Sequence, residues 1–220
     1  MILDNFAVLE GCDGSGTTTQ LELLSRRFAG IPGLFYATAE PTRGPVGELI
    51  RRLLKEEGRP KESGVSGETR VSPETLARLF AADRAEHLYG SGGIVERCSV
   101  RGELVVSDRY SPSSLVYQAI DCGEELSRIL NESFPLPELL VYIDIDGETA
   151  EKRIAGRPDR EIFEHLEFQE KVRKGYLKLL PAWEKSGVRV LTVDGSRSPE
   201  EVAEGVWRAV AEMPIVKKAI

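Results

Sequence analysis

The chain has 220 residues, of which 41% are hydrophobic and 30% are charged, so it can bury a sizeable core and is not a disordered protein. Its 29 Lys and Arg against 36 Asp and Glu give a formal net charge of -7, which argues against nonspecific binding to nucleic acid and requires local positive clusters for any polyanionic ligand. The three cysteines, Cys12, Cys98 and Cys122, are too few and too scattered for a disulfide framework or a four-thiolate zinc site, and they favour a reducing cytoplasm.

The predicted elements alternate between strand and helix along the chain. Short apolar runs rich in β-branched residues predict buried strands at residues 6–9, 34–38, 104–107, 139–145 and 188–193. Amphipathic stretches with apolar residues three or four apart predict helices at residues 21–28, 46–54, 73–88, 148–154 and 168–183. This alternation predicts an α/β fold in which a five-stranded parallel sheet is covered by helices on both faces.

The sequence gives no sign of a membrane segment or of a second domain. The first ten residues carry Asp4 and only a short apolar stretch, so they indicate a strand and neither a secretory signal nor a membrane span. No run of eighteen apolar residues follows, and we therefore expect no membrane partner. Residues 56–72 are rich in Gly, Ser and charge, which favours a mobile loop over a domain linker. We expect one domain over residues 1–220.

A glycine-rich segment at residues 11–19 follows the first predicted strand directly and precedes a helix. A P-loop has Gly, four residues, then Gly-Lys-Ser/Thr, because the glycines let backbone N–H groups wrap a phosphate at a helix N-terminus. Gly11, Gly16 and Thr18 fit this pattern, but Thr17 stands in place of the lysine. The strand before, the helix after and a hydroxyl suited to Mg²⁺ outweigh the alternative of a plain glycine-rich turn. The predicted ATP phosphate site comprises Gly11, Gly14, Ser15, Gly16, Thr17, Thr18 and Thr19.

Further motifs follow the P-loop in a fixed order. Residues 40–51 read EPTRGPVGELIR, residues 79–84 read LFAADR and residues 107–110 read SDRY. With the P-loop, this ordered set resembles the thymidylate kinase family over residues 6–202. The resemblance implies a P-loop kinase fold and the phosphorylation of dTMP to dTDP with ATP and Mg²⁺, in dTTP synthesis. It also implies a homodimer.

Three arginines lie just after predicted strand ends or at the start of the next helix, namely Arg43, Arg51 and Arg109. In a parallel sheet that edge carries the ligands, and planar guanidinium groups match phosphate oxygens in pairs. Each arginine alone is more typical of a solvated surface. By resemblance, Arg109 with Arg43 or Arg51 grips the acceptor phosphate.

Two acidic residues are candidates for the centre of the site. Asp108 closes an apolar strand, so we expect its carboxylate near the bound metal beside Thr18, with a helix N-cap as the alternative role. Asp13 lies inside the phosphate loop, where an acid repels phosphates, and an acceptor for a sugar hydroxyl explains it better. By resemblance, Asp13 accepts a hydrogen bond from the 3′-hydroxyl of dTMP.

Phe80 and Arg84 are four residues apart on one predicted helix and therefore share a face. They offer a ring to stack on a pyrimidine and donors for its O4, although an aromatic residue at this spacing is more often part of the core. By resemblance they are the thymine-binding pair. The resemblance also places Ser114 near the base N3 and Tyr117 near the sugar, where its ring disfavours a ribose 2′-hydroxyl.

The segment from about residue 153 to residue 164 carries Arg153, Arg157 and Arg160 around the helix-breaking Gly156 and Pro158. It resembles the lid of the family, and the alternative is an ordinary charged surface. Loss of a charge-assisted hydrogen bond at Thr17 weakens binding by about 1.5–3 kcal/mol unless another cation substitutes. We expect the lid arginines to replace the missing lysine in part and to stabilise charge in the transition state.

Two other functions remain open from the sequence. A protein that has lost catalysis together with its lysine could act as a nucleotide-binding sensor or scaffold. A kinase for another deoxynucleotide is the second alternative, because Phe80 and Arg84 favour a pyrimidine without excluding dUMP.

Overall fold

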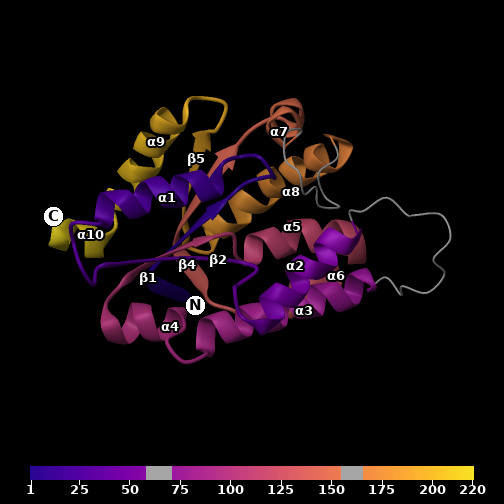
Figure 1. The fold of residues 1–220 in the computed structure, drawn as a ribbon, viewed down its shortest axis with the longest axis horizontal. Coiled ribbons are helices and arrows are strands. Elements are labelled where there is room, and N and C mark those ends of the chain that lie inside the picture. Colours follow the sequence, from indigo (N-terminus) through magenta and orange to yellow (C-terminus); the bar gives the residue numbers. More distant parts are fainter. Residues whose placement is uncertain (58–70, 155–165) are drawn as a thin grey trace.

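The strands form one parallel sheet in the computed structural model, which describes residues 1–57, 71–154 and 166–220 (Figure 1). The order across the sheet is β2-β3-β1-β4-β5, and every neighbouring pair is parallel. The strands are β1 (Ile2–Glu10), β2 (Phe35–Ala39), β3 (Leu104–Asp108), β4 (Leu136–Asp144) and β5 (Arg189–Asp194). The predicted five-stranded parallel sheet is therefore confirmed.

Both faces of the sheet are buried, as the central strand β1 illustrates. Phe6 and Val8 belong to the apolar core on one face, and Ala7 and Leu9 belong to the core on the other face. All four side chains have 0% exposed surface. A strand buried on both faces needs a continuous apolar run, which is the pattern that identified these strands in the sequence.

Helices cover the two faces in separate layers (Figure 1). One face carries α1 (Thr17–Phe28), α9 (Pro199–Ala211) and α10 (Pro214–Ala219). The other face carries α2 (Pro45–Glu57), α3 (Pro73–Tyr89), α5 (Ser111–Cys122) and α8 (Leu166–Lys185). Shorter elements are α4 (Ile94–Glu96), the π-helical turn η1 (Arg97–Arg101), α6 (Glu124–Asn131) and α7 (Gly147–Ile154). Among the described helices, none combines the length and the apolar composition that crossing a bilayer requires.

The five predicted helices are present, and the described residues also form five α-helices and a π-helical turn that were not predicted. α1 begins at Thr17, earlier than predicted, because Gly16 adopts a left-handed conformation (φ 94°) that starts the helix. The helical elements that were not predicted are α4, η1, α5, α6, α9 and α10. The predicted loop at residues 56–72 is described only at its ends, where α2 stops at Glu57 and Ser72 caps α3; residues 58–70 lie outside the described part of the chain.

The carboxyl ends of three neighbouring strands meet at one edge of the sheet. Leu9 in β1 and Ala39 in β2 both lie opposite Asp108 at the end of β3. The glycine-rich loop after β1, Arg109 after β3 and Glu40 after β2 therefore leave the sheet side by side. In open parallel sheets this edge is where ligands bind.

Candidate active site

The loop between β1 and α1 can hold its shape only with glycine at particular positions. A Cβ on Gly11 would lie 2.4 Å from Ser15 Oγ and 2.8 Å from the carbonyl oxygen of Ile143. Gly14 and Gly16 have φ values of 81° and 94°, which favour glycine. The loop curls back to the N-terminus of α1, so it has the geometry of an anion-binding loop.

A hydroxyl and a carboxylate meet beside this loop. Thr18 Oγ1 donates to Asp108 Oδ2 at 2.5 Å, and Asp108 Oδ1 is buried without a hydrogen-bond partner among the described residues. Hydroxyl and carboxylate oxygens are the ligands that Mg²⁺ takes in phosphoryl-transfer sites. Thr18 and Asp108 therefore fit a magnesium ion, whereas the buried Thr17 brings no charge to the loop.

Arg109 lies between the phosphate loop and a neighbouring pocket. Its backbone has a φ of 69°, unusual for a residue with a Cβ, and is held by bonds from Arg109 N to Leu9 O (2.9 Å) and from Ser107 Oγ to Arg109 O (2.7 Å). Its Nη2 donates to Asp13 Oδ1 at 2.6 Å, and its Nη1 donates to Gly11 O at 3.1 Å. Such a backbone persists only where its surroundings enforce it, so the guanidinium is fixed in place.

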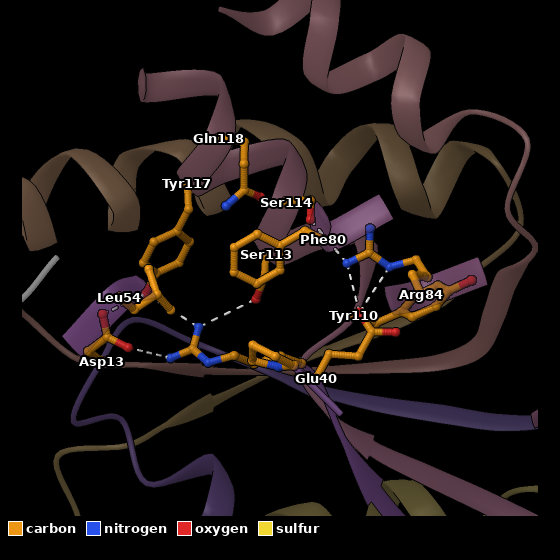
Figure 2. Close-up of a pocket in the computed structure, with 12 residues that line it drawn as sticks. Asp13, Glu40, Leu54, Phe80, Arg84, Tyr110, Ser113, Ser114, Tyr117 and Gln118 are labelled. Carbon is orange, nitrogen blue, oxygen red and sulfur yellow. Dashed lines mark hydrogen bonds and ion pairs between the residues drawn. The ribbon is translucent and has the colours of Figure 1, made fainter. Parts of the chain in front are cut away.

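The pocket extends from Asp13 at one end to Arg84 and Glu40 at the other, with the ring of Phe80 between them (Figure 2). The pocket is open to solvent, and its lining combines apolar and aromatic side chains with a few charged groups, as in sites for small ligands. The residues predicted for dTMP that line it are Asp13, Phe80, Arg84, Arg109, Ser114 and Tyr117. Lining residues that were not predicted are Glu40, Pro41, Leu54, Tyr110, Ser113 and Gln118.

Arg84 is 1% exposed, and four of its five guanidinium hydrogens have partners at the inner end of the pocket. Nε and Nη2 donate to Glu40 Oε2 at 2.9 and 2.7 Å, and Nη2 also donates to Ser114 Oγ at 3.0 Å. Nη1 donates to Asn131 Oδ1, and His87 Nδ1 lies 3.1 Å from the second oxygen of Glu40. These contacts orient the guanidinium plane and leave one Nη1 hydrogen for a ligand.

Glu10, at the end of β1, lies buried beneath the pocket. Its Oε1 accepts from Tyr110 N at 2.9 Å, and its Oε2 accepts from Ser113 Oγ at 2.7 Å and from Tyr176 OH at 2.8 Å. Burial raises the pKa of the Glu10 carboxyl to about 7, against the lowering effects of the Ser113 hydrogen bond and the Arg109 charge. This carboxyl ties the pocket helix α5 to α8.

The remaining predicted arginines have different positions. Arg43 and Arg51 are exposed and do not line the pocket, although Arg51 donates to the carbonyl of the lining residue Pro41. Arg153, at the end of α7, reaches the phosphate loop: its Nη1 is 3.3 Å from Gly14 O, and its Nη2 is 2.9 Å from the carbonyl oxygen of Gly195. Arg157 and Arg160, with most of the predicted lid, lie outside the described residues.

Two signals could have revealed the missed lining residues. Glu40 directly follows β2 and begins the EPTRG motif, so the motif places an acid at the ligand-binding edge of the sheet, where it pairs with Arg84. Ser113 and Gln118 lie on α5, at the three- and four-residue spacing of one helix face with Ser114 and Tyr117. That face was not recognised because α5 was not predicted to be a helix.

Comparisons with known proteins agree over most of the chain. The model of the thymidylate kinase family matches residues 9–206. A protein of Treponema pallidum assigned as a thymidylate kinase is 39% identical over 219 residues, which cover 96% of this chain and 97% of that protein. Proteins of Aeropyrum pernix and Methanococcus aeolicus with the same assignment are 42% and 34% identical; the alignments cover 93% and 97% of this chain and 92% and 100% of theirs.

Proposed function

The chain belongs to the thymidylate kinase family, and on that basis we propose that it transfers the γ-phosphoryl group of ATP to dTMP, giving dTDP for dTTP synthesis. The observation that carries the proposal is the junction of a phosphate loop with a pocket lined by Phe80, Arg84 and Arg109, bridged by the contact of Arg109 with Asp13. Phosphoryl transfer between two nucleotides requires that they be held end to end while their oxygens are neutralised.

The acceptor nucleotide occupies the pocket with its base at the Arg84 end. Phe80 stacks on the pyrimidine, and the remaining Nη1 hydrogen of Arg84 meets the thymine O4 while Ser114 lies beside the base N3. Tyr117, whose hydroxyl donates to Asp13 Oδ2 at 3.2 Å, borders the sugar. Asp13 accepts a hydrogen bond from the 3′-hydroxyl, and this contact places the 5′-phosphate beside Arg109.

The donor phosphates lie in the glycine-rich loop, where backbone N–H groups and the N-terminus of α1 face them. Thr18 and Asp108 hold Mg²⁺, which when bound shields the phosphate oxygens and the charge that develops on them. Arg109 neutralises the acceptor phosphate, and Arg43 or Arg51 is proposed as a second contact although neither lines the pocket. Catalysis rests on positioning and on charge, without a covalent intermediate.

Arg153 is our candidate for the cation that replaces the missing lysine. Its guanidinium lies against the Gly14 carbonyl of the loop in which Thr17 occupies the lysine position. An arginine there can donate two parallel hydrogen bonds to phosphate oxygens. Arg157 and Arg160 are proposed to add to this charge, although they lie outside the described residues.

Four features of the working protein belong to the same proposal. The whole chain, residues 1–220, acts as one domain, and two copies form a homodimer. The enzyme works in the cytoplasm, which agrees with its three free cysteines. Its partners are ATP and dTMP, and neither nucleic acid nor a membrane is required.

A coupled assay tests the activity directly. Purified protein with Mg²⁺ and ATP is given dTMP, dUMP, dCMP, dGMP or thymidine, and ADP release is measured together with chromatography of the nucleotide products. We expect dTMP to have the highest kcat/KM and dTDP to appear in step with ADP. ADP release no faster than in the absence of an acceptor would contradict kinase activity, and a preference for another acceptor would contradict the substrate.

A nucleotide-binding sensor or scaffold is not favoured. Such a protein needs only the ATP side, whereas this chain keeps a complete acceptor side in which Asp13, Phe80, Arg84 and Arg109 surround one pocket.

A further inference from the structure

Gln169 is a fully buried polar residue near the start of α8, with 0% exposed surface. A buried amide destabilises a fold unless its donor and its acceptor are both paired. Gln169 Oε1 accepts from the backbone N of Asp13 at 3.0 Å, and Gln169 Nε2 donates to Asp13 Oδ2 at 3.0 Å. The side-chain amide therefore grips one residue of the phosphate loop at two points.

The bond from Gln169 Nε2 fixes the orientation of the Asp13 carboxylate. Its Oδ1 accepts from Arg109 Nη2 at 2.6 Å, and its Oδ2 accepts from Tyr117 OH at 3.2 Å as well as from Gln169. A carboxylate offers about four acceptor positions, so these three donors leave room for one more. The bond to Gln169 Oε1 uses the backbone N–H of Asp13, so this N–H of the loop points toward α8.

The same face of α8 reaches the site a second time. Tyr176, seven residues after Gln169 and thus on the same side of the helix, donates to the buried carboxylate of Glu10 at 2.8 Å. Glu10 ends β1 and Asp13 follows three residues later. Two polar side chains of one helix therefore hold both ends of the segment that carries Asp13.

We infer that Gln169 is a positioning residue that turns the Asp13 carboxylate toward the acceptor nucleotide, and that it thereby sets the preference for acceptors that carry a 3′-hydroxyl. This inference rests on the proposed function, in which Asp13 accepts that hydroxyl. In this proposal Gln169 acts through Asp13 and makes no contact with the reacting atoms.

The test compares dTMP with 2′,3′-dideoxythymidine 5′-monophosphate, which lacks the hydroxyl. Both kcat/KM with ATP and the dissociation constant by calorimetry are measured for wild type, Gln169→Leu, Gln169→Glu and Asp13→Asn. Gln169→Leu removes the two bonds to Asp13, and Gln169→Glu keeps the size but sets an oxygen against Asp13 Oδ2. The control is Lys178→Ala, a substitution on α8 like those of Gln169, which removes an exposed ion pair with Glu124 of α6.

We expect wild type to prefer dTMP over the dideoxy nucleotide by about 10- to 100-fold, the value of one hydrogen bond to a charged group. Both Gln169 variants should lose that preference, because kcat/KM and binding fall for dTMP alone. The same quantities for the dideoxy nucleotide should change by less than about threefold. Asp13→Asn should give the same pattern, and adding Gln169→Leu to it should change little. Lys178→Ala should match wild type.

Equal losses for both acceptors in folded Gln169 variants, or an unchanged preference, would overturn the inference. Circular dichroism and thermal unfolding identify the folded variants, and Gln169→Glu serves if Gln169→Leu does not fold. If wild type binds dTMP with the preference described but transfers no phosphate, the proposed function fails while the binding data still decide the role of Gln169. If wild type phosphorylates both acceptors equally, the inference alone fails.

Discussion

Charged side chains lie buried around the pocket, and each has partners that offset its loss of hydration. Arg84 is 1% exposed and Glu40 is 5% exposed, and the two are joined by hydrogen bonds of 2.9 and 2.7 Å. Breaking a buried pair by removing one partner is strongly destabilising, because the other charge is left without compensation. The pair therefore holds one orientation, and the single Nη1 hydrogen that it leaves for a ligand has a fixed direction.

Replacing the guanidinium group of Arg84 should reduce the selectivity of the pocket for thymine. In Arg84→Lys the ammonium group cannot keep Glu40, Ser114 and Asn131 together, and we expect the dTMP KM to rise by about 10- to 100-fold. The preference for dTMP over dCMP, whose base has an amino group in place of O4, should fall in parallel. Steady-state assays with both acceptors measure this.

Arg78→Lys is the matched control for that substitution. Arg78 is exposed on the same helix and donates to the carbonyl of Glu74 at 2.9 Å, away from the pocket lining. Arg78→Lys should leave the kinetic constants of both acceptors, dTMP and dCMP, unchanged. An unchanged dTMP to dCMP ratio in a folded Arg84→Lys protein would contradict the role assigned to Arg84.

Glu10 should make the fold less stable as the pH rises from about 4.5 to about 7. Burial raises its pKa from 4.5 to about 7, although hydrogen bonds from Ser113 and Tyr176 and the charge of Arg109 lower it. The unfolded chain releases this proton near pH 4.5, whereas the folded chain holds it until about pH 7. Within that window the folded state binds more protons, so the free energy of unfolding falls with rising pH, by roughly 3 kcal/mol in total.

Chemical denaturation of wild type and Glu10→Gln between pH 5 and pH 7.5 measures this effect. The neutral amide does not titrate, so the difference in unfolding free energy between the two proteins isolates the Glu10 carboxyl. We expect Glu10→Gln to gain relative stability as the pH rises. Curves that stay parallel across the window would refute the raised pKa.

At the scale of elements, the sequence predicted the strands and helices whose structure is decided by their apolar pattern. The inner strands β1, β3 and β4 carry apolar runs that the sheet buries on both faces, whereas the edge strands β2 and β5 are only partly buried; the predicted positions of all five agree with β1 to β5. α5 was missed because its Ser, Val and Tyr residues have modest helix propensity, and packing between the core and α6 decides its conformation. α9 was missed although Ser198 and Glu201 have the spacing of a capping box.

The site shows the same difference between residues that belong to a sequence motif and residues whose role depends on contacts made by the fold. The motifs gave Asp13, Phe80, Arg84 and Arg109, which lie together around one pocket. Residues that act through another side chain carry no pattern of their own in the sequence. The EPTRG motif contains Glu40, but its pairing with Arg84 spans 44 residues and depends on the fold, so the sequence does not give the partner.

The capping box of α9 should contribute to stability without affecting the dTMP pocket. Ser198 Oγ accepts from Glu201 N at 3.3 Å, and Glu201 Oε2 accepts from Ser198 N at 3.1 Å. Ser198→Ala should lower the unfolding free energy by about 1 kcal/mol and the Tm by roughly 2–4 °C. Ser198→Asp, which keeps an acceptor, should retain most of the stability.

Thermal unfolding and the dTMP KM measure these two effects separately. α9 packs on the face of the sheet opposite to the helices that form the pocket, so the KM should stay unchanged in both variants. A loss of stability as large in Ser198→Asp as in Ser198→Ala would show that the cap is not the cause.

At the scale of the whole molecule, positive charge reaches the phosphate loop from two distant parts of the chain. Arg109 follows β3 and contacts Gly11, whereas Arg153 ends α7 and contacts Gly14. The parallel sheet makes this possible, because it gathers the ends of β1, β3 and β4 at one edge. A lysine within the loop is one way to place charge on the donor phosphates, and the fold offers another from outside the loop.

This view predicts that a lysine restored at position 17 compensates for loss of Arg153. Arg153→Ala should raise the ATP KM by about 10- to 100-fold, the value of a hydrogen bond to a charged group. Thr17→Lys alone should change it little, but Thr17→Lys in the Arg153→Ala protein should recover most of the loss. Thr17→Met, of similar length without charge, should recover none. Steady-state kinetics on the four proteins of the cycle give the coupling between the two positions, and additive effects would mean that Arg153 does not stand in for the lysine.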